Sequence, residues 1–149
     1  MIEPLHLEVE LACPADHAFR VWTERFAQWW PRGHTMSGDP DAIVFEPWLG
    51  GRIYERAAGR EIDWGEVTAW APPRSFSYLW RLRRDRRDAT EVTVTIVALD
   101  EGSSRLEIVH RGWERLGAGG PGWRDANANG WAGLLPHYIG ALNQRERQP

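Results

Sequence analysis

The chain has 149 residues, which suits one domain spanning residues 1–149, and its formal net charge of −3 provides no basic field for nucleic acid or an anionic membrane. The single cysteine, Cys13, excludes a disulfide framework and is interpreted as a small buried hydrophobic residue. No stretch approaches about 20 apolar residues, and the start MIEPLHLEVE lacks the basic and apolar regions of a signal peptide. We therefore expect a cytoplasmic protein with no nucleic-acid or membrane partner.

The first predicted element is a strand at residues 5–11, LHLEVEL, where apolar and polar residues alternate. A helical region follows, because Pro14 suits a first helical turn and Asp16 lies near the positive end of the helix dipole. Its apolar stripe recurs at spacings of three and four: Phe19, Trp22 and Phe26. We expect two short helices here, followed by a loop at residues 32–42.

Alternating segments then predict six strands, at residues 43–48, 51–57, 61–73, 74–83, 89–99 and 103–113. Short turns separate them, and consecutive strands joined by short turns form an antiparallel meander. The run at residues 81–88 holds five arginines and two aspartates. It is interpreted as a solvated hairpin tip rather than a phosphate site, because no aromatic residue is interleaved and the net charge is negative.

The C-terminal part predicts a long helix, from about Asp125 to Arg145, after a glycine-rich loop at residues 112–124. One face of the helix steps by four, three and four residues: Trp131, Leu135, Tyr138 and Leu142. Pro136 lies inside this helix, where it should remove one backbone hydrogen bond and kink the axis. The order of elements predicts an α+β fold whose helices cover one face of a twisted sheet, with a cavity left between them.

Several runs of sequence, in this order, resemble a known family: CPADHAFRVWTERFAQWWP (13–31), GGRIYER (50–56), DWGEVTAWAPPRSFSYLW (63–80), EVTVTI (91–96), SRLEIVHRGWE (104–114) and GWAGLL (130–135). Together they are similar to the START-like SRPBCC superfamily, in the branch named for homologues of the heat-shock-protein ATPase activator. The resemblance implies a helix-grip fold, a curved antiparallel sheet of six to seven strands around a long C-terminal helix, with a ligand cavity between them. Pro136 departs from the family pattern, in which a helix former is expected.

Ten tryptophans, an unusual number, suggest an aromatic cavity for a small apolar or aromatic molecule. The residues expected to line it are Trp29, Trp30, Ile53, Glu55, Val67, Phe76, Tyr78, Trp80, Val94, Ile108, His110, Trp131, Leu135 and Tyr138. In this interpretation, Trp29 and Trp30 form either the mouth of the cavity or a packed corner. The alternative is that large side chains such as Tyr78, Trp80 and Trp131 fill the space completely.

Glu55 and His110 are the two candidate catalytic residues, because each shares a strand face with apolar neighbours. A buried carboxylate and imidazole could transfer protons, since acids and bases act best with a pKa near the working pH. The competing interpretation is structural: the two side chains pair with each other or with the backbone. The five histidines lack metal-ligand spacing, so no metal is expected, and no nucleotide-binding or hydrolase motif implies a cofactor.

Three functions remain open from the sequence. The first is binding of a small hydrophobic or aromatic molecule. The second is a cyclase/dehydratase- or hydrolase-like reaction that uses Glu55 and His110 as acid and base. The third, regulation of a chaperone ATPase, rests on the family resemblance alone. Surplus tryptophans on the outer sheet face also allow a homodimer.

Overall fold

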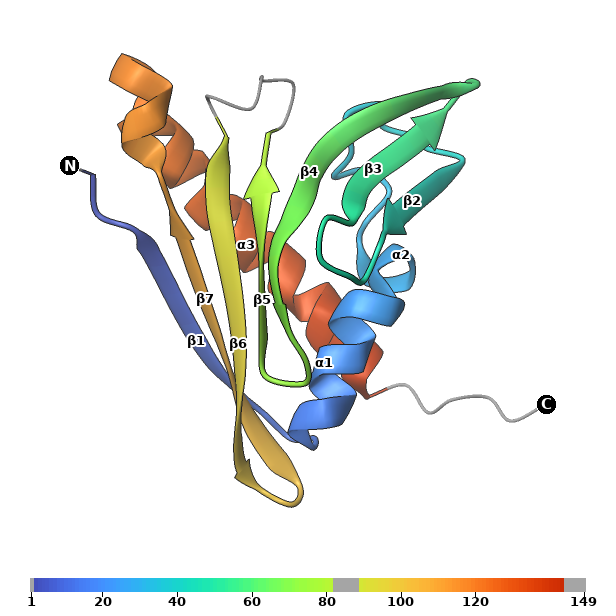
Figure 1. The fold of residues 1–149 in the computed structure, drawn as a ribbon, viewed down its shortest axis with the longest axis vertical. Helices are drawn as coiled ribbons and strands as arrows, with labels where there is room; N and C mark the ends of the chain where they lie inside the picture. Colours follow the sequence, from blue (N-terminus) through green and yellow to red (C-terminus); the bar gives the residue numbers. More distant parts are fainter. Residues whose placement is uncertain (1, 82–88, 144–149) are drawn as a thin grey trace.

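A computed structural model describes residues 2–81 and 89–143 of the chain, and its main element is one antiparallel sheet of seven strands (Figure 1). The strands are β1 (Leu5–Leu11), β2 (Ala42–Phe45), β3 (Arg52–Ala57), β4 (Arg60–Ala71), β5 (Ser75–Trp80), β6 (Thr90–Asp100) and β7 (Ser103–Arg111). Their order in the sheet is β1-β7-β6-β5-β4-β3-β2, so β1 joins the far edge of the meander. The predicted six to seven strands and their antiparallel pairing are confirmed.

The helices lie on one face of this sheet. They are α1 (Ala15–Glu24), α2 (Phe26–Trp29), a 3-10 helix η2 (Trp113–Gly119) and α3 (Gly120–Leu142). Figure 1 shows α3 crossing behind the strands, with α1 beside its C-terminal half. Hydrogen bonds join these two helices: the Tyr138 hydroxyl donates to the Ala18 carbonyl at 2.7 Å, and His17 Nε2 lies 3.0 Å from the Leu142 carbonyl. The architecture confirms the α+β arrangement predicted from the element order and the helix-grip fold that the family resemblance implied.

The glycine-rich stretch at residues 112–124 is not the expected loop, because η2 and the first turn of α3 occupy most of it. Tertiary packing outweighs the poor helix propensity of glycine here. Trp113 is buried, and a Cβ on Gly120 would lie 2.4 Å from the Trp113 carbonyl oxygen, so only glycine permits this approach. The predicted start of the helix at Asp125 is therefore five residues too late, and Arg145 lies outside the described residues.

The buried face of α3 differs from the predicted face at one position. Leu134 is buried and Leu135 is only half-buried, so the face is formed by Trp131, Leu134, Tyr138 and Leu142. Either leucine fits a spacing of three or four, and the side chains on the sheet decide between them. The helix continues through Pro136, which is exposed to solvent.

Trp22 of α1 is at the centre of the core and has no exposed surface. Its ring centroid lies 5.0 Å from those of both Trp29 and Tyr138, and 6.0 and 6.1 Å from those of Trp131 and Phe76. Contacts between tilted aromatic rings at these distances are favourable beyond the area they bury. These rings fill the middle of the space between helices and sheet, so any pocket must lie toward one end. Among the described helices, none is long and apolar enough to span a membrane.

Candidate functional site

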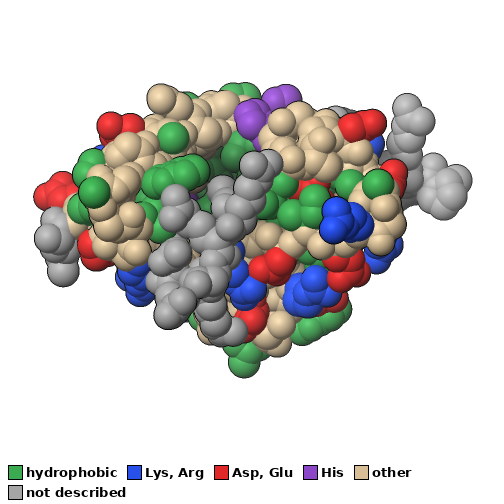
Figure 2. Space-filling view, turned by 90° about the horizontal axis from the view of Figure 1, so that it is seen from above, with side chains coloured by type: hydrophobic (Ala, Val, Ile, Leu, Met, Phe, Trp, Pro, Cys, Tyr) green, Lys and Arg blue, Asp and Glu red, His purple; other side chains and the backbone are tan. Residues whose placement is uncertain are grey.

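A pocket of about 340 Å³ lies between the connection of α2 to β2, strands β4 and β5, and the first half of α3. Its described lining residues are Trp30, His34, Thr35, Met36, Trp64, Trp80, Trp123, Asn127, Gly130, Trp131 and Leu134. Figure 2 looks onto this end of the molecule, where hydrophobic side chains gather around a hollow. The volume lies within the range of roughly 300–1,000 Å³ that is usual for small-molecule sites.

Three tryptophans form one continuous wall of the pocket. The ring centroids of Trp30, Trp64 and Trp80 lie 5.4 to 5.8 Å apart in every pair. Trp30 and Trp64 are buried and Trp80 is half-buried, so the wall is firmly packed against the core. The Trp30 indole N–H donates to the His34 carbonyl at 2.9 Å, which holds this ring against the start of the connection to β2. The pocket therefore has a mostly aromatic wall along this side.

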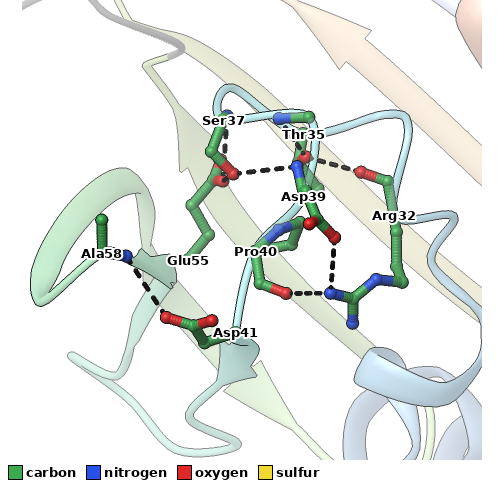
Figure 3. Close-up of polar contacts among 9 residues, drawn as sticks. Arg32, Thr35, Ser37, Asp39, Pro40, Asp41, Glu55 and Ala58 are labelled. Atoms are coloured by element: carbon green, nitrogen blue, oxygen red, sulfur yellow. Dashed lines mark hydrogen bonds and ion pairs between the residues drawn. The ribbon is translucent and has the colours of Figure 1, made fainter.

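Glu55 of β3 lies behind this wall and is completely buried. Figure 3 shows its carboxylate pointing toward Ser37 of the loop. Its Oε1 accepts hydrogen bonds from the Met36 amide at 2.6 Å and from the Trp64 indole N–H at 2.8 Å. Its Oε2 accepts from the Ser37 hydroxyl at 2.6 Å and from the Ser37 amide at 3.1 Å. One carboxylate thus fixes an aromatic ring of the pocket and the loop beside it.

The same bonds determine the charge of Glu55. Burial on its own raises the pKa of this carboxyl, but the hydrogen bonds from Ser37, Met36 and Trp64 together favour the ionised form more strongly. The net result is a pKa below the usual value near 4.5. Glu55 is therefore an anion at neutral pH and an acceptor of hydrogen bonds, which suits an anchor better than a general acid.

Residues 31–41 form a loop that is also braced internally (Figure 3). Arg32 Nη2 donates to Asp39 Oδ1 at 2.9 Å and to the Pro40 carbonyl, which closes the loop across its base. The Thr35 hydroxyl donates to the Arg32 carbonyl at 2.6 Å and accepts from the Gly38 amide at 3.0 Å. These bonds keep His34, Thr35 and Met36 at the pocket.

His110 of β7 supports the opposite side of the pocket and is also completely buried. Its Nδ1 accepts a hydrogen bond from the Trp131 indole N–H at 3.1 Å. Because an indole can only donate, the ring proton must be on Nε2, which then donates to Thr90 Oγ1 at 2.8 Å. The Thr90 hydroxyl lies 3.4 Å from the Trp80 carbonyl, so this chain of bonds connects two pocket residues.

Burial lowers the pKa of His110 from its usual 6.5 to about 3. The imidazole is therefore neutral over the physiological range and has both nitrogens engaged by protein groups. A second proton on Nδ1 would face the N–H of Trp131, which adds a local reason for the neutral form. His110 thus fixes the position of Trp131 rather than exchanging protons with a ligand.

A family model described as Activator of Hsp90 ATPase homolog 1-like protein matches residues 12–139 of the chain. The chain belongs to this family. The match confirms the resemblance seen in the sequence runs, and it agrees with the helix-grip arrangement of sheet and helix.

Solved structures similar to this chain match it over almost its whole length. An anthrahydroquino-gamma-pyrone synthase, Txn09, complexed with SUM is 30% identical, with a TM-score of 0.66 over 94% of this chain and 97% of that one. CalC, a self-sacrificing resistance protein from Micromonospora echinospora, is 26% identical, with a TM-score of 0.73 over 95% and 94%. The Aha1 dimer from Colwellia psychrerythraea, 14% identical with a TM-score of 0.71 over 99% and 100%, shares the fold alone. No curated protein matches the chain.

Three of the predicted ligand-binding residues line the pocket of this family member: Trp30, Trp80 and Trp131. The structure places the other eleven outside the described lining: Trp29, Ile53, Glu55, Val67, Phe76, Tyr78, Val94, Ile108, His110, Leu135 and Tyr138. All of these except Leu135 are buried, and most belong to the hydrophobic core. The sequence left open whether aromatic side chains line a cavity or fill it. In the structure they do both, because they fill the middle of the space between helices and sheet and line a pocket at one end.

One of the two structural alternatives, pairing of Glu55 with His110, is absent from the hydrogen bonds of the described residues, because their strands β3 and β7 are separated in the sheet by β4, β5 and β6. The other alternative, a backbone partner, holds for Glu55. Each of the two residues also bonds a different tryptophan of the pocket. The sequence correctly indicated that both side chains are buried but not that they contact these tryptophans.

Sequence reasoning missed eight lining residues: His34, Thr35, Met36, Trp64, Trp123, Asn127, Gly130 and Leu134. The first three lie in a loop, where no periodicity in the sequence indicates which side chains face the interior. Trp64 belongs both to the hydrophobic core and to the lining, because it is buried and its ring lies beside those of Trp30 and Trp80. Asn127 and Gly130 were overlooked because the prediction gave weight to apolar residues on α3.

One group of polar side chains on the far face of the sheet has metal-ligand character. Within the described residues, the ligand atoms of His6, Glu8 and Glu107 lie within 4.8 Å of one another. The sequence did not suggest this group, because Glu107 comes from β7, opposite Glu8 of β1. Arg105 lies 4.0 Å from Glu107, and His6 and Glu8 are exposed, which is typical of a solvated charged face.

Arg81 is the described member of the basic run at residues 81–88, and residues 82–88 lie outside the described part of the chain. Its guanidinium forms ion pairs with Asp63 and with Glu66, whose Oε1 lies 3.3 Å away. The Arg81 side chain is mostly covered rather than solvated as predicted, and its charge is matched by two carboxylates of β4.

Proposed function

We propose that the chain acts as one domain that binds a small, flat, mostly apolar molecule in the pocket between the loop at residues 31–41 and α3. The observation that carries this proposal is the lining itself, in which five tryptophans surround about 340 Å³: Trp30, Trp64, Trp80, Trp123 and Trp131. Aromatic faces give a flat ring a large contact area with little loss of conformational entropy. The N–H groups of three of these rings are already bonded within the protein.

One of the similar structures, the synthase, supports the same kind of ligand. The synthase and CalC are similar to this chain at 30% and 26% identity over more than nine-tenths of their lengths. The name of the synthase indicates a fused aromatic product, whose flat shape would suit a pocket with indole walls. Catalysis by Glu55 and His110, the alternative from the sequence, has less support, because neither side chain lines the pocket. Regulation of a chaperone ATPase rests on the family name alone.

Filling the pocket from α3 should weaken binding strongly. A Cβ at Gly130 meets no atom within 4 Å, and Gly130 lines the pocket, so Gly130→Leu places its side chain in the ligand's space. We expect the affinity for 2-methoxynaphthalene, measured by quenching of tryptophan fluorescence, to fall at least tenfold. Leucine should also stabilise the helix by about 0.5–1 kcal/mol relative to glycine.

Gly133→Leu provides the matched control. Gly133 is in the same helix, its Cβ position is equally open, and it lies outside the described lining of the pocket. This variant should gain the same helix stability and bind the probe as the wild type does. Equal affinities in the two variants would remove the pocket from the proposal.

We also propose that the chain forms a homodimer. The structure from Colwellia psychrerythraea is that of an Aha1 dimer. In this chain Trp48 and Leu49 are exposed by 53% and 66% in the β2–β3 connection, not on the outer sheet face as the sequence suggested. Exposed apolar side chains of this size are common at interfaces. Light scattering should give the mass of two chains, and Trp48→Ser should shift it toward one.

A further inference from the structure

The polar groups that line the pocket differ in whether they already form hydrogen bonds within the protein. The Thr35 hydroxyl both donates and accepts within its own loop, and the Trp30, Trp64 and Trp131 N–H groups have protein acceptors. The carboxamide nitrogen of Asn127 donates to the Trp123 carbonyl at 2.9 Å, which leaves its oxygen for a ligand. The His34 imidazole forms no hydrogen bond with any described residue.

His34 is also the one titratable side chain among the described lining residues. Its backbone is fixed at both ends, because its N–H donates to the Pro31 carbonyl at 3.0 Å and its carbonyl accepts from Trp30 at 2.9 Å. The next two residues of the loop are held by Glu55 and by the brace at Arg32. The imidazole is therefore attached to a well-supported backbone at the pocket, and the residue is exposed to solvent. A polar group beside an apolar surface determines which ligand substituents are accepted.

We propose that the pocket recognises aromatic molecules that carry a phenolic hydroxyl, with the His34 imidazole accepting its hydrogen bond. This inference rests on the proposed function and names its ligand class. The indole walls select a flat ring, and a neutral imidazole nitrogen is a good acceptor for an acidic O–H. The Asn127 carboxamide oxygen, from α3, offers a second acceptor for a further hydroxyl. With a ligand that has no such donor, the His34 imidazole would form its hydrogen bond with water instead.

The test compares two probes of similar shape, 2-naphthol and 2-methoxynaphthalene, which differ in the ability to donate a hydrogen bond. By fluorescence titration, the wild type should bind 2-naphthol about tenfold more tightly. His34→Leu should remove this preference and leave the affinity for 2-methoxynaphthalene within about twofold. His34→Gln, which keeps an acceptor, should retain part of the preference. His137→Leu, at an exposed position of α3 outside the described lining, is the control and should behave as the wild type.

The outcomes separate the two proposals. If both probes bind the wild type equally, or if the preference persists in His34→Leu, the assignment of His34 is wrong while the binding function stands. If neither probe binds at its solubility limit, the proposed function itself fails. If Gly130→Leu blocks both probes and His34→Leu removes only the preference, both proposals are supported.

Discussion

Glu55→Ala should destabilise the folded protein by about 3 kcal/mol at pH 7. The substitution removes an ionised acceptor from four hydrogen bonds, those of Met36, Ser37 and Trp64. Bonds to charged groups contribute about 1.5–3 kcal/mol each, and the buried Trp64 N–H would lose its partner without gaining water. The Met36 and Ser37 amides are part-buried and can recover some of this from solvent. Urea unfolding followed by circular dichroism measures the change.

The charge of Glu55 gives the same prediction a pH dependence. Because the pKa of Glu55 is lower in the folded than in the unfolded state, the stability it provides is present above the unfolded pKa near 4.5. It is lost as the pH falls through the folded pKa. Glu55→Gln should therefore lose less stability than the wild type on acidification from pH 5 to pH 3. Glu61→Gln, an exposed carboxylate of β4 with arginine partners, is the matched control and should change stability little at pH 7.

Loss of the Glu55 anchor should also be visible in the loop itself. Hydrogen exchange at the Met36 and Ser37 amides should become faster in Glu55→Ala, while amides in the centre of β6 keep their protection. If the loop amides exchange as slowly as in the wild type, Glu55 does not hold the loop. Such a result would contradict the anchor interpretation even if the global stability fell.

The sequence predicted the sheet and helices well because alternation and helical stripes are local signals. The strand segments in residues 43–113, β1 and the long helix follow from the spacing of apolar residues alone. The helix start was misplaced because the glycines of residues 112–124 suggest a loop, whereas the contact of Gly120 with Trp113 is a tertiary feature. The choice of Leu134 over Leu135 likewise depends on what lies opposite the helix.

The site was less predictable because its contacts join residues that are distant in sequence. Glu55 lies 18 and 19 positions from Ser37 and Met36, and His110 lies 21 positions from Trp131. A buried polar residue on an apolar strand face is a strong signal that a partner exists, but periodicity says nothing about which one. The sequence therefore identified Glu55 and His110 as special residues. Its alternative of a backbone partner holds for Glu55, which accepts hydrogen bonds from the Met36 and Ser37 amides, whereas the tryptophan partners were not foreseen. His34, in a loop without periodicity, gave no signal at all.

His110 should make the protein lose stability steeply as the pH falls below about 6.5. The pKa of His110 is about 6.5 in the unfolded chain and about 3 in the folded protein. Between these two pH values the unfolded chain binds a proton at His110 that the folded protein does not. Stability then rises with pH throughout this window, and well below pH 6.5 the slope approaches about 1.4 kcal/mol per pH unit for one group. Above pH 6.5 both states are neutral at this residue, and its contribution no longer changes.

His110→Asn isolates this effect. Asparagine can offer an oxygen to the Trp131 N–H near the place of Nδ1, but it does not titrate. Between pH 6.5 and pH 5, above the range in which Glu55 gains a proton, urea unfolding of the variant should depend less on pH than that of the wild type. His110→Leu should instead lose about 2 kcal/mol at pH 7, because the buried Trp131 N–H and Thr90 hydroxyl lose their partner.

The binding measurement distinguishes a positioning role from a catalytic one. If His110 only holds Trp131, His110→Asn should keep most of the probe affinity, and His110→Leu should weaken it severalfold because the ring is no longer fixed. His137→Asn, at an exposed position of α3, should leave both the pH dependence and the affinity unchanged. A wild-type slope in His110→Asn would mean that the imidazole takes up a proton in the folded state, and the hydrogen-bond assignment at Nδ1 would then be wrong.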